Sequence, residues 1–162
     1  MPKILMVCLG NICRSPLAHG ILKHKASAEN IAIEVDSAGT GSWHVGSAPD
    51  IRSIEVADKH GIDISNQKAR QFTTHDFNKF DHIYVMDKSN FSDVIRLAST
   101  QNDVDKVELI LQHLNSEDPP SVPDPYYGGN DGFEHVYQLL DAACQKVIDK
   151  IKQNLWVKEI SI

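Results

Sequence analysis

Cys8 and Arg14, near the amino terminus, are the residues whose types and spacing most directly suggest chemistry. Residues 4–7, before the cysteine, form an apolar run with the length and branching of a buried strand. Ser15 and Pro16, after the arginine, favour an N-cap and a first helical position. A tight loop between them would point its backbone N–H groups inward at a helix N-terminus, which is an arrangement that binds anions. The pattern predicts a cysteine nucleophile in a phosphate-binding loop.

The residue types within this loop suit that chemistry. A thiol attacks as its thiolate, a form that helix N-termini and nearby cations stabilise. Arg14 can hold two phosphoryl oxygens with its planar fork, Gly10 lets the backbone approach the anion, and Asn11 tolerates a positive φ. A buried packing cysteine is the competing interpretation, and the residues that follow it disfavour that role. We expect the phosphate to be bound by Leu9, Gly10, Asn11, Ile12, Cys13, Arg14 and Ser15.

A second informative stretch, residues 115–131, holds four prolines and therefore fits neither a helix nor a central strand. A loop of this length in a compact domain is usually functional or disordered. Asp124 precedes Pro125, which restricts it to extended conformations and so fixes the direction of its carboxyl group. Such a carboxylic acid could donate the proton that the leaving oxygen of a phosphate monoester needs. From the residues alone, an ordinary turn aspartate before a proline is the more common interpretation.

The run Cys-Leu-Gly-Asn-Ile-Cys-Arg-Ser-Pro, residues 8–16, resembles the signature loop of the low-molecular-weight protein tyrosine phosphatases. The resemblance continues in the family's order over nearly the whole chain. It is carried by residues 36–40 (DSAGT), Trp43, residues 68–71 (KARQ), residues 86–90 (MDKSN) and residues 124–128 (DPYYG). The resemblance implies hydrolysis of phosphotyrosine or other aryl phosphate monoesters through a phosphocysteine intermediate.

The resemblance also implies roles for residues outside the loop. Asp124 would protonate the leaving group and then activate water, acting with Cys8 and Arg14 as the catalytic set. The substrate pocket would be formed by Ile12, Trp43, Tyr126 and Tyr127, and the network that supports the loop by Asn11, Ser15, Ser37 and Asp87.

Cys13 is close enough in sequence to Cys8 to form a disulfide if the loop curls, which would block the nucleophile reversibly. The resemblance favours that redox role over a small packing residue. Where several relatives place a histidine in the supporting network, this chain has Gln67, whose amide can donate a hydrogen bond but carries no charge. The apolar side chain of Ile12 suits an aryl ester. In the relatives that act on phosphoarginine, the resemblance places a threonine at this position instead.

The composition limits the partners. The chain has 162 residues and a net charge of −6 without a basic cluster, which argues against binding to nucleic acid or to an anionic membrane. No apolar run has the length of a membrane span or a signal peptide. Three cysteines without an export signal indicate a reducing setting. We expect a cytoplasmic monomer whose partners are phosphotyrosine-containing proteins and inorganic phosphate or related oxyanions.

Strands alternate with helices along the chain, which predicts one α/β domain over residues 1–162 with a parallel sheet and helices on both faces. Ligands of such sheets bind beyond the carboxyl ends of the strands, where Cys8 lies. The resemblance implies a three-layer fold with four strands in the order 2-1-3-4. The expected strands are residues 4–7, 31–38, 81–86 and 107–111, and the expected helices are 15–27, 50–60, 87–99 and 132–154, followed by a tail over about 155–162.

Two other classes of function stay open. An arsenate reductase would cycle Cys8 and Cys13 as a redox pair, but reductases of this fold use further cysteines soon after the third strand, and residues 81–99 contain none. A non-catalytic phosphate-binding regulatory module would need neither the nucleophile nor the acid, and both are present. The eight histidines show no metal-ligand spacing, so we assign no metal. The covalent route also needs no cofactor.

Overall fold

A computed structural model describes residues 1–128 and 130–160, with side chains described over residues 1–128 and 131–154. A four-stranded parallel sheet in the order β2-β1-β3-β4 forms the middle layer, which confirms the predicted architecture. Cys8 pairs with Gly39 at the carboxyl end of the sheet. The strands are β1 (Lys3–Cys8), β2 (Glu34–Gly39), β3 (His82–Val85) and β4 (Val107–Leu109).

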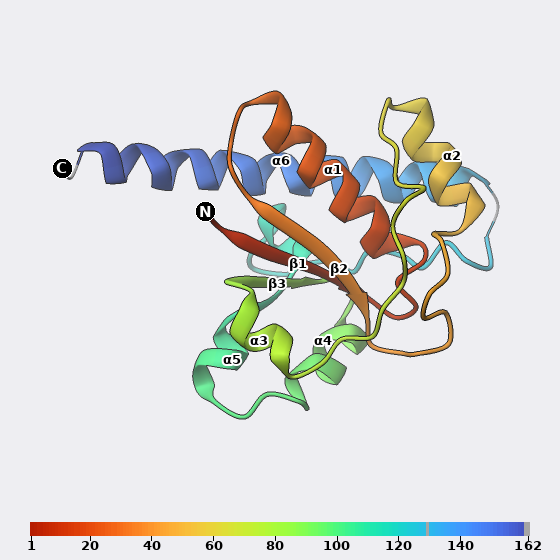
Figure 1. Cartoon of the computed structure of the whole chain (residues 1–162), viewed down its shortest axis with the longest axis horizontal. Coiled ribbons are helices and arrows are strands. Elements are labelled where there is room, and N and C mark those ends of the chain that lie inside the picture. Colours follow the sequence, from red (N-terminus) through yellow and green to blue (C-terminus); the bar gives the residue numbers. More distant parts are fainter. Residues whose placement is uncertain (129, 161–162) are drawn as a thin grey trace.

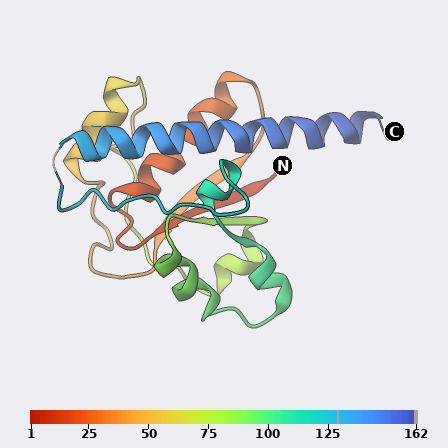
Figure 2. The same ribbon diagram turned by 180° about the vertical axis from the view of Figure 1, so that it is seen from behind.

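Helices cover both faces of this sheet (Figure 1). Helices α1 and α6 lie on one face, with α2 packed against both, and the three short helices α3, α4 and α5 lie on the other. Figure 2 shows that the carboxyl-terminal part of α6 extends beyond the sheet. The helices are α1 (Arg14–Ala28), α2 (Ile51–Lys59), α3 (His75–Lys79), α4 (Lys88–Ile95), α5 (Gln101–Asp105), the 3-10 helix η1 (Ile110–His113) and α6 (Asn130–Ile160).

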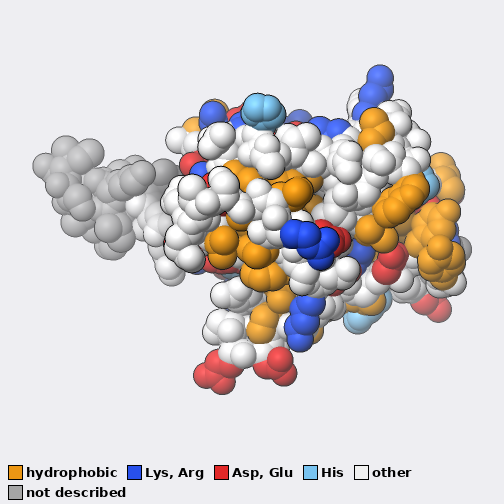
Figure 3. All heavy atoms as spheres, turned by 90° about the horizontal axis from the view of Figure 1, so that it is seen from below, with side chains coloured by type: hydrophobic (Ala, Val, Ile, Leu, Met, Phe, Trp, Pro, Cys, Tyr) orange, Lys and Arg blue, Asp and Glu red, His pale blue; other side chains and the backbone are white. Residues whose placement is uncertain are grey.

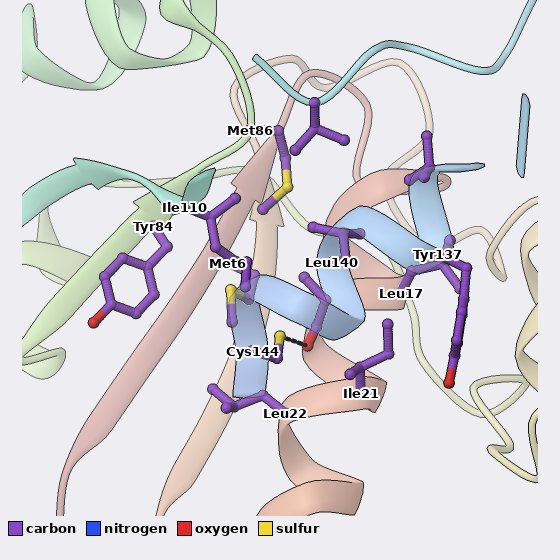
Figure 4. Close-up of a cluster of buried hydrophobic side chains, with 14 of the residues drawn as sticks. Met6, Leu17, Ile21, Leu22, Tyr84, Met86, Ile110, Tyr137, Leu140 and Cys144 are labelled. Carbon is purple, nitrogen blue, oxygen red and sulfur yellow. Dashed lines mark hydrogen bonds between the residues drawn. The ribbon is translucent and has the colours of Figure 1, made fainter. Parts of the chain in front are cut away.

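Two hydrophobic cores lie on opposite faces of the sheet, because successive side chains of a strand point in opposite directions. Met6 joins the core beneath α1 and α6, and Leu5 joins the core beneath the short helices. Figure 4 shows the first core, where Cys144 of α6 is completely buried. Its thiol donates to the carbonyl oxygen of Ala18 at 3.7 Å, and burial raises its pKa to about 12. Cys144 is therefore a packing residue.

Several expected boundaries differ from the structure. Helix α1 begins at Arg14 with Cys13 in the N-cap position, so Ser15 is not the N-cap. Its hydroxyl instead faces the sulfur of Cys8. Strand β2 begins three positions later than predicted, because its partner β1 begins only at Lys3, opposite Glu34.

At the other edge, β4 ends at Leu109, opposite Val85 at the end of β3, and the chain then turns into η1. The third expected helix is shorter than predicted, and its first turn is closed by a capping box between Asp87 and Asn90. Helix α5, with only one and a half turns, was not predicted. Residues 155–160 of the expected tail belong to α6, and residues 161–162 lie outside the described residues.

Candidate active site

The phosphate loop, residues 8–15, curls around the sulfur of Cys8. Asn11 takes the left-handed conformation with φ of 56°, which turns its backbone N–H toward Cys8 Sγ at 3.3 Å. The chain after β2 holds the loop from behind, since the N–H of Thr40 donates to the Cys8 carbonyl oxygen at 2.9 Å. Cys8 is 2% exposed, so its thiol lies at the bottom of the loop.

The Asn11 side chain keeps the loop in this unusual conformation. Its Nδ2 donates to Ser15 Oγ at 2.8 Å and to Ser37 Oγ at 3.0 Å, and its Oδ1 accepts from the backbone N–H of Arg70 at 3.0 Å. Both amide hydrogens and the carbonyl oxygen are therefore used in a buried position. Ser15 Oγ in turn lies 3.0 Å from Cys8 Sγ. Three of the residues expected to support the loop thus form one connected network.

Behind Ser37 lies an imidazole that the sequence analysis missed. His19 Nδ1 is 3.4 Å from Ser37 Oγ, and burial lowers the pKa of this histidine. Gln67 is nearby but does not reach Ser37 or Asn11. Its Nε2 donates to the Pro16 carbonyl oxygen at 3.1 Å instead. The imidazole beside this network therefore comes from α1. His19 follows Ser15 by four residues, which places both side chains on one face of the helix, and this spacing could have predicted its position.

Arg14 is fixed by hydrogen bonds on one side of its guanidinium group. Nη1 donates to Asp87 Oδ2 at 2.7 Å and to the Val122 carbonyl oxygen at 3.1 Å. Nη2 lies 3.8 Å from Asp124 Oδ2. The arginine is only 3% exposed. Asp87, which also caps α4, therefore holds Arg14 in place at the wall of the loop.

Asp124 lies on the acid loop, which we define as residues 122–128. The backbone N–H of Val122 donates to the chain just after β3 at 2.8 Å, so the loop begins beside the sheet. Asp124 Oδ1 accepts from the N–H of Tyr126 at 3.0 Å, which fixes one carboxyl oxygen. The Asp124 side chain is 42% exposed. Its second oxygen, Oδ2, faces Arg14.

A cleft of about 330 Å³ joins these groups. The ring of Trp43 lies directly on Gly41, where any larger residue would clash with it, and this tryptophan is 72% exposed. Figure 3 shows hydrophobic side chains in the middle of this face and at its right-hand end. His44 is a wall residue that was not predicted. The cleft is lined by Cys8, Leu9, Gly10, Ile12, Cys13, Arg14, Trp43, His44, Asp124, Tyr126 and Tyr127.

Cys13 faces the same cleft as Cys8, and both are free thiols. Burial raises the pKa of Cys13 to about 12, and Asp50 and Cys8 add to that effect. Cys13 is therefore a protonated thiol at neutral pH.

Within the described residues, no group of three or more His, Cys, Asp or Glu side chains is arranged to hold a metal ion. Among the same residues, no helix has both the length and the apolar character that crossing a membrane requires.

A family model described as low molecular weight phosphotyrosine protein phosphatase matches residues 3–157. The chain belongs to this family. The low molecular weight phosphotyrosine protein phosphatase of Schizosaccharomyces pombe is 44% identical to it over 143 residues, which are 86% of this chain and 90% of that protein. The predicted family is thereby confirmed, and with it the enzyme class of protein-tyrosine phosphatase.

Solved structures of phosphatases are similar to this family member over nearly its whole length. The protein tyrosine phosphatase of Entamoeba histolytica has a TM-score of 0.89 and 33% identity, covering 95% of this chain and 99% of its own. A drosophila arginine phosphatase has a TM-score of 0.85 and 35% identity, covering 93% of this chain and 98% of its own. The fold is therefore shared by phosphatases with different named substrates.

Proposed function

We propose that this phosphatase hydrolyses phosphotyrosine and related aryl phosphate monoesters in two steps. In the first, the Cys8 thiolate attacks phosphorus while the bond from phosphorus to the phenol oxygen breaks. Asp124 gives its proton to that oxygen, so the products are a phosphocysteine and a neutral phenol. Arg14 and the N–H groups of the phosphate loop stabilise the equatorial phosphoryl oxygens.

In the second step, water attacks the phosphocysteine. Asp124, now a carboxylate, takes a proton from the water, and the bond from sulfur to phosphorus breaks to release phosphate and the Cys8 thiolate. Ser15 stabilises the departing sulfur, because its hydroxyl accepts from Asn11 and keeps its own hydrogen for Cys8. The enzyme returns to its starting protonation state without a cofactor.

One observation supports this mechanism above all. A cleft of about 330 Å³ brings the nucleophile Cys8, the arginine Arg14 and the acid Asp124 to its walls. Nη2 of Arg14 lies 3.8 Å from the free carboxyl oxygen of Asp124, so a phosphate held by the arginine would have its ester oxygen near the acid.

The cleft walls support an aryl substrate. Ile12, Trp43 and the tyrosine pair offer apolar and aromatic surface around its mouth. Tyr126 and Tyr127 meet edge to face with ring centroids 4.9 Å apart, which suits stacking with a phenyl group. We therefore expect phosphotyrosine-containing proteins as substrates and phosphate as the product ligand. Because the drosophila relative is named an arginine phosphatase, phosphoarginine is the competing substrate.

We also propose that Cys13 protects the nucleophile against oxidation. If peroxide converts Cys8 to a sulfenic acid, the Cys13 thiol displaces water from that sulfur, and a disulfide forms without a further oxidant. A thiol reductant would restore both cysteines. We further propose that the protein acts as a monomer in the reducing cytoplasm. Peroxide treatment tests the pair: activity of the wild type should return with reductant, and that of Cys13→Ser should not.

Hydrolysis of aryl phosphates in the presence of a chelator tests the proposed function. Wild type should be active and inhibited by vanadate, Cys8→Ser should be inactive but still bind phosphate, and Asp118→Ala, an exposed aspartate of the same proline-rich stretch, should match wild type. Faster hydrolysis of a phosphoarginine peptide than of a phosphotyrosine peptide would reassign the substrate. Thiol-dependent turnover of arsenate, with no ester hydrolysis, would contradict the proposal.

A further inference from the structure

The acid loop is held to the rest of the domain by an arginine that the mechanism has not used. At its start, Arg14 and the chain after β3 bind Val122. For the second half of the loop, the hydrogen bonds to another element among the described residues all come from Arg52 of α2. Its Nη2 donates to the Tyr126 carbonyl oxygen at 3.0 Å, and its Nη1 donates to the Gly128 carbonyl oxygen at 3.3 Å.

Arg52 is itself held rigidly by Asp50. Nε donates to Asp50 Oδ1 at 3.0 Å and Nη2 donates to Asp50 Oδ2 at 2.9 Å, which is a bidentate pair. Asp50 is also the N-cap of α2, where it accepts from the Arg52 backbone N–H at 2.9 Å. The guanidinium group therefore has one orientation relative to the helix, and its remaining N–H groups point toward the acid loop.

Aromatic rings lie against the guanidinium group of Arg52. Its central carbon is 4.5 Å from the ring centroid of Phe133 and 5.7 Å from that of Tyr126. Phe133 is buried in the first turns of α6, and Tyr126 belongs to the acid loop. A guanidinium group can stack flat on a ring while the N–H groups at its edge donate hydrogen bonds, which the compact ammonium group of lysine cannot do. Arg52 thus bridges α2, α6 and the acid loop.

The same end of α2 is bonded to the phosphate loop. The backbone N–H of Asp50 donates to the Ile12 carbonyl oxygen at 2.8 Å, and Ser53 Oγ donates to the Cys13 carbonyl oxygen at 3.1 Å. A continuous set of hydrogen bonds therefore leads from the phosphate loop through Asp50 and Arg52 to Tyr126. Tyr126 lies two residues after Asp124 and donates its N–H to that carboxyl group.

We infer that Arg52 is a positioning residue that sets the distance between the acid Asp124 and the nucleophile loop. The inference rests on the proposed acid role of Asp124. Proton transfer in the first step needs the carboxyl group within hydrogen-bond reach of the ester oxygen, and small displacements of such groups slow reactions strongly. Without Arg52, the Tyr126 and Gly128 carbonyl groups lose their partners, and Asp124 leaves that position.

The dependence of the rate on the leaving group tests this role. The value of kcat/KM reports the steps up to release of the phenol, and phenyl phosphate needs the acid more than 4-nitrophenyl phosphate does. Arg52→Met should lower kcat/KM about tenfold for phenyl phosphate and about twofold or less for 4-nitrophenyl phosphate. Arg52→Lys should fall between Arg52→Met and wild type.

Arg96→Met is the matched control, because Arg96 is 75% exposed and pairs only with Asp93 among the described residues. It should behave as wild type. If Arg52→Met and Arg52→Lys both keep the wild-type rate ratio between the two esters, the positioning role is wrong.

A double variant separates this inference from the proposed function. In the Asp124→Ala background, Arg52→Met should cause no further loss of kcat/KM for phenyl phosphate, because the residue that Arg52 positions is absent. A further loss of about tenfold would mean that Arg52 acts elsewhere, and would overturn the inference. If Asp124→Ala alone lowers kcat/KM equally for both esters, Asp124 is not the acid, and the proposed function fails instead.

Discussion

The hydroxyl oxygen of Ser15 lies 3.0 Å from the sulfur of Cys8, deep in the phosphate loop. Because this oxygen already accepts a hydrogen bond from Asn11, its own hydrogen is directed at the sulfur. A donor there stabilises negative charge on sulfur, which in the proposed mechanism develops when the phosphocysteine breaks down.

Ser15→Ala should therefore slow the second step more than the first. We expect kcat to fall about tenfold and a burst of phenol to appear that is equal to the enzyme concentration. Stopped-flow release of 4-nitrophenol measures both phases. Ser27→Ala, in the exposed last turns of α1, serves as the control. A lower rate without any burst would indicate that Ser15 acts in the first step.

Asn11 combines a left-handed backbone with a fully used side chain, and two substitutions separate these features. Asn11→Gly keeps the backbone conformation and loses the amide, whereas Asn11→Ala loses both. Asn11→Ala should be less stable than Asn11→Gly by about 1 kcal/mol, because of its positive φ. Urea unfolding measures the difference. Equal stabilities of the two variants would show that the loop relaxes away from the left-handed conformation.

Because the pKa of Cys13 is raised to about 12, we expect this cysteine to resist alkylation. At a pH of about 7.5, Cys13 is almost entirely protonated and reacts slowly. Burial also raises the pKa of Cys144 to about 12. Iodoacetamide should therefore modify Cys8 first, and phosphate should protect it. Peptide mass mapping after partial alkylation gives the site, and label on Cys13 at a comparable rate would contradict the assignment.

Buried histidines should make the protein less stable in mild acid. Burial lowers the pKa of His113, a side chain beside Tyr84, and Glu108 opposes that shift only in part. Above the ordinary value of 6.5, both the folded and the unfolded states are neutral and stability does not depend on this group. Below 6.5, the unfolded chain takes up the proton first, so stability falls until the pH passes the folded-state pKa.

His113→Phe keeps a ring against Tyr84 and removes this titration. Urea unfolding at several pH values between about 7.5 and 5 should show a smaller loss of stability for the variant than for wild type. Asp50, beside Arg52, is a carboxyl group with a lowered pKa. Its contribution to stability is lost only when the pH falls below its ordinary pKa of 3.8. Parallel pH curves for wild type and variant would show that His113 does not contribute.

The features that could best be predicted from the sequence lie at the ends of strands. Cys8 ends an apolar run and precedes a helix-forming segment, so local pattern was enough to place a loop around it. The sheet order followed from the family resemblance, since alternation of strands and helices alone does not specify which strands are neighbours.

Contacts between distant elements could not be predicted in this way. Nothing local in the segment around Arg52 indicates that it binds the Tyr126 carbonyl group, 74 positions away. The proximity of His19 to Ser37 likewise depends on how α1 crosses β2. The start of β2 was misplaced because residues 31–33 alternate like a strand but have no neighbour to pair with.

Transfer of the phosphoryl group to Cys8 is the central claim, and its direct test is capture of the intermediate. Asp124→Ala, which lacks the proposed base of the second step, should accumulate a phosphoenzyme when mixed with 4-nitrophenyl phosphate and quenched rapidly. Peptide mass mapping should place the phosphoryl group on Cys8, and the Cys8→Ser, Asp124→Ala double variant should carry none. Turnover without a phosphoenzyme, or a phosphoryl group on another residue, would contradict the account.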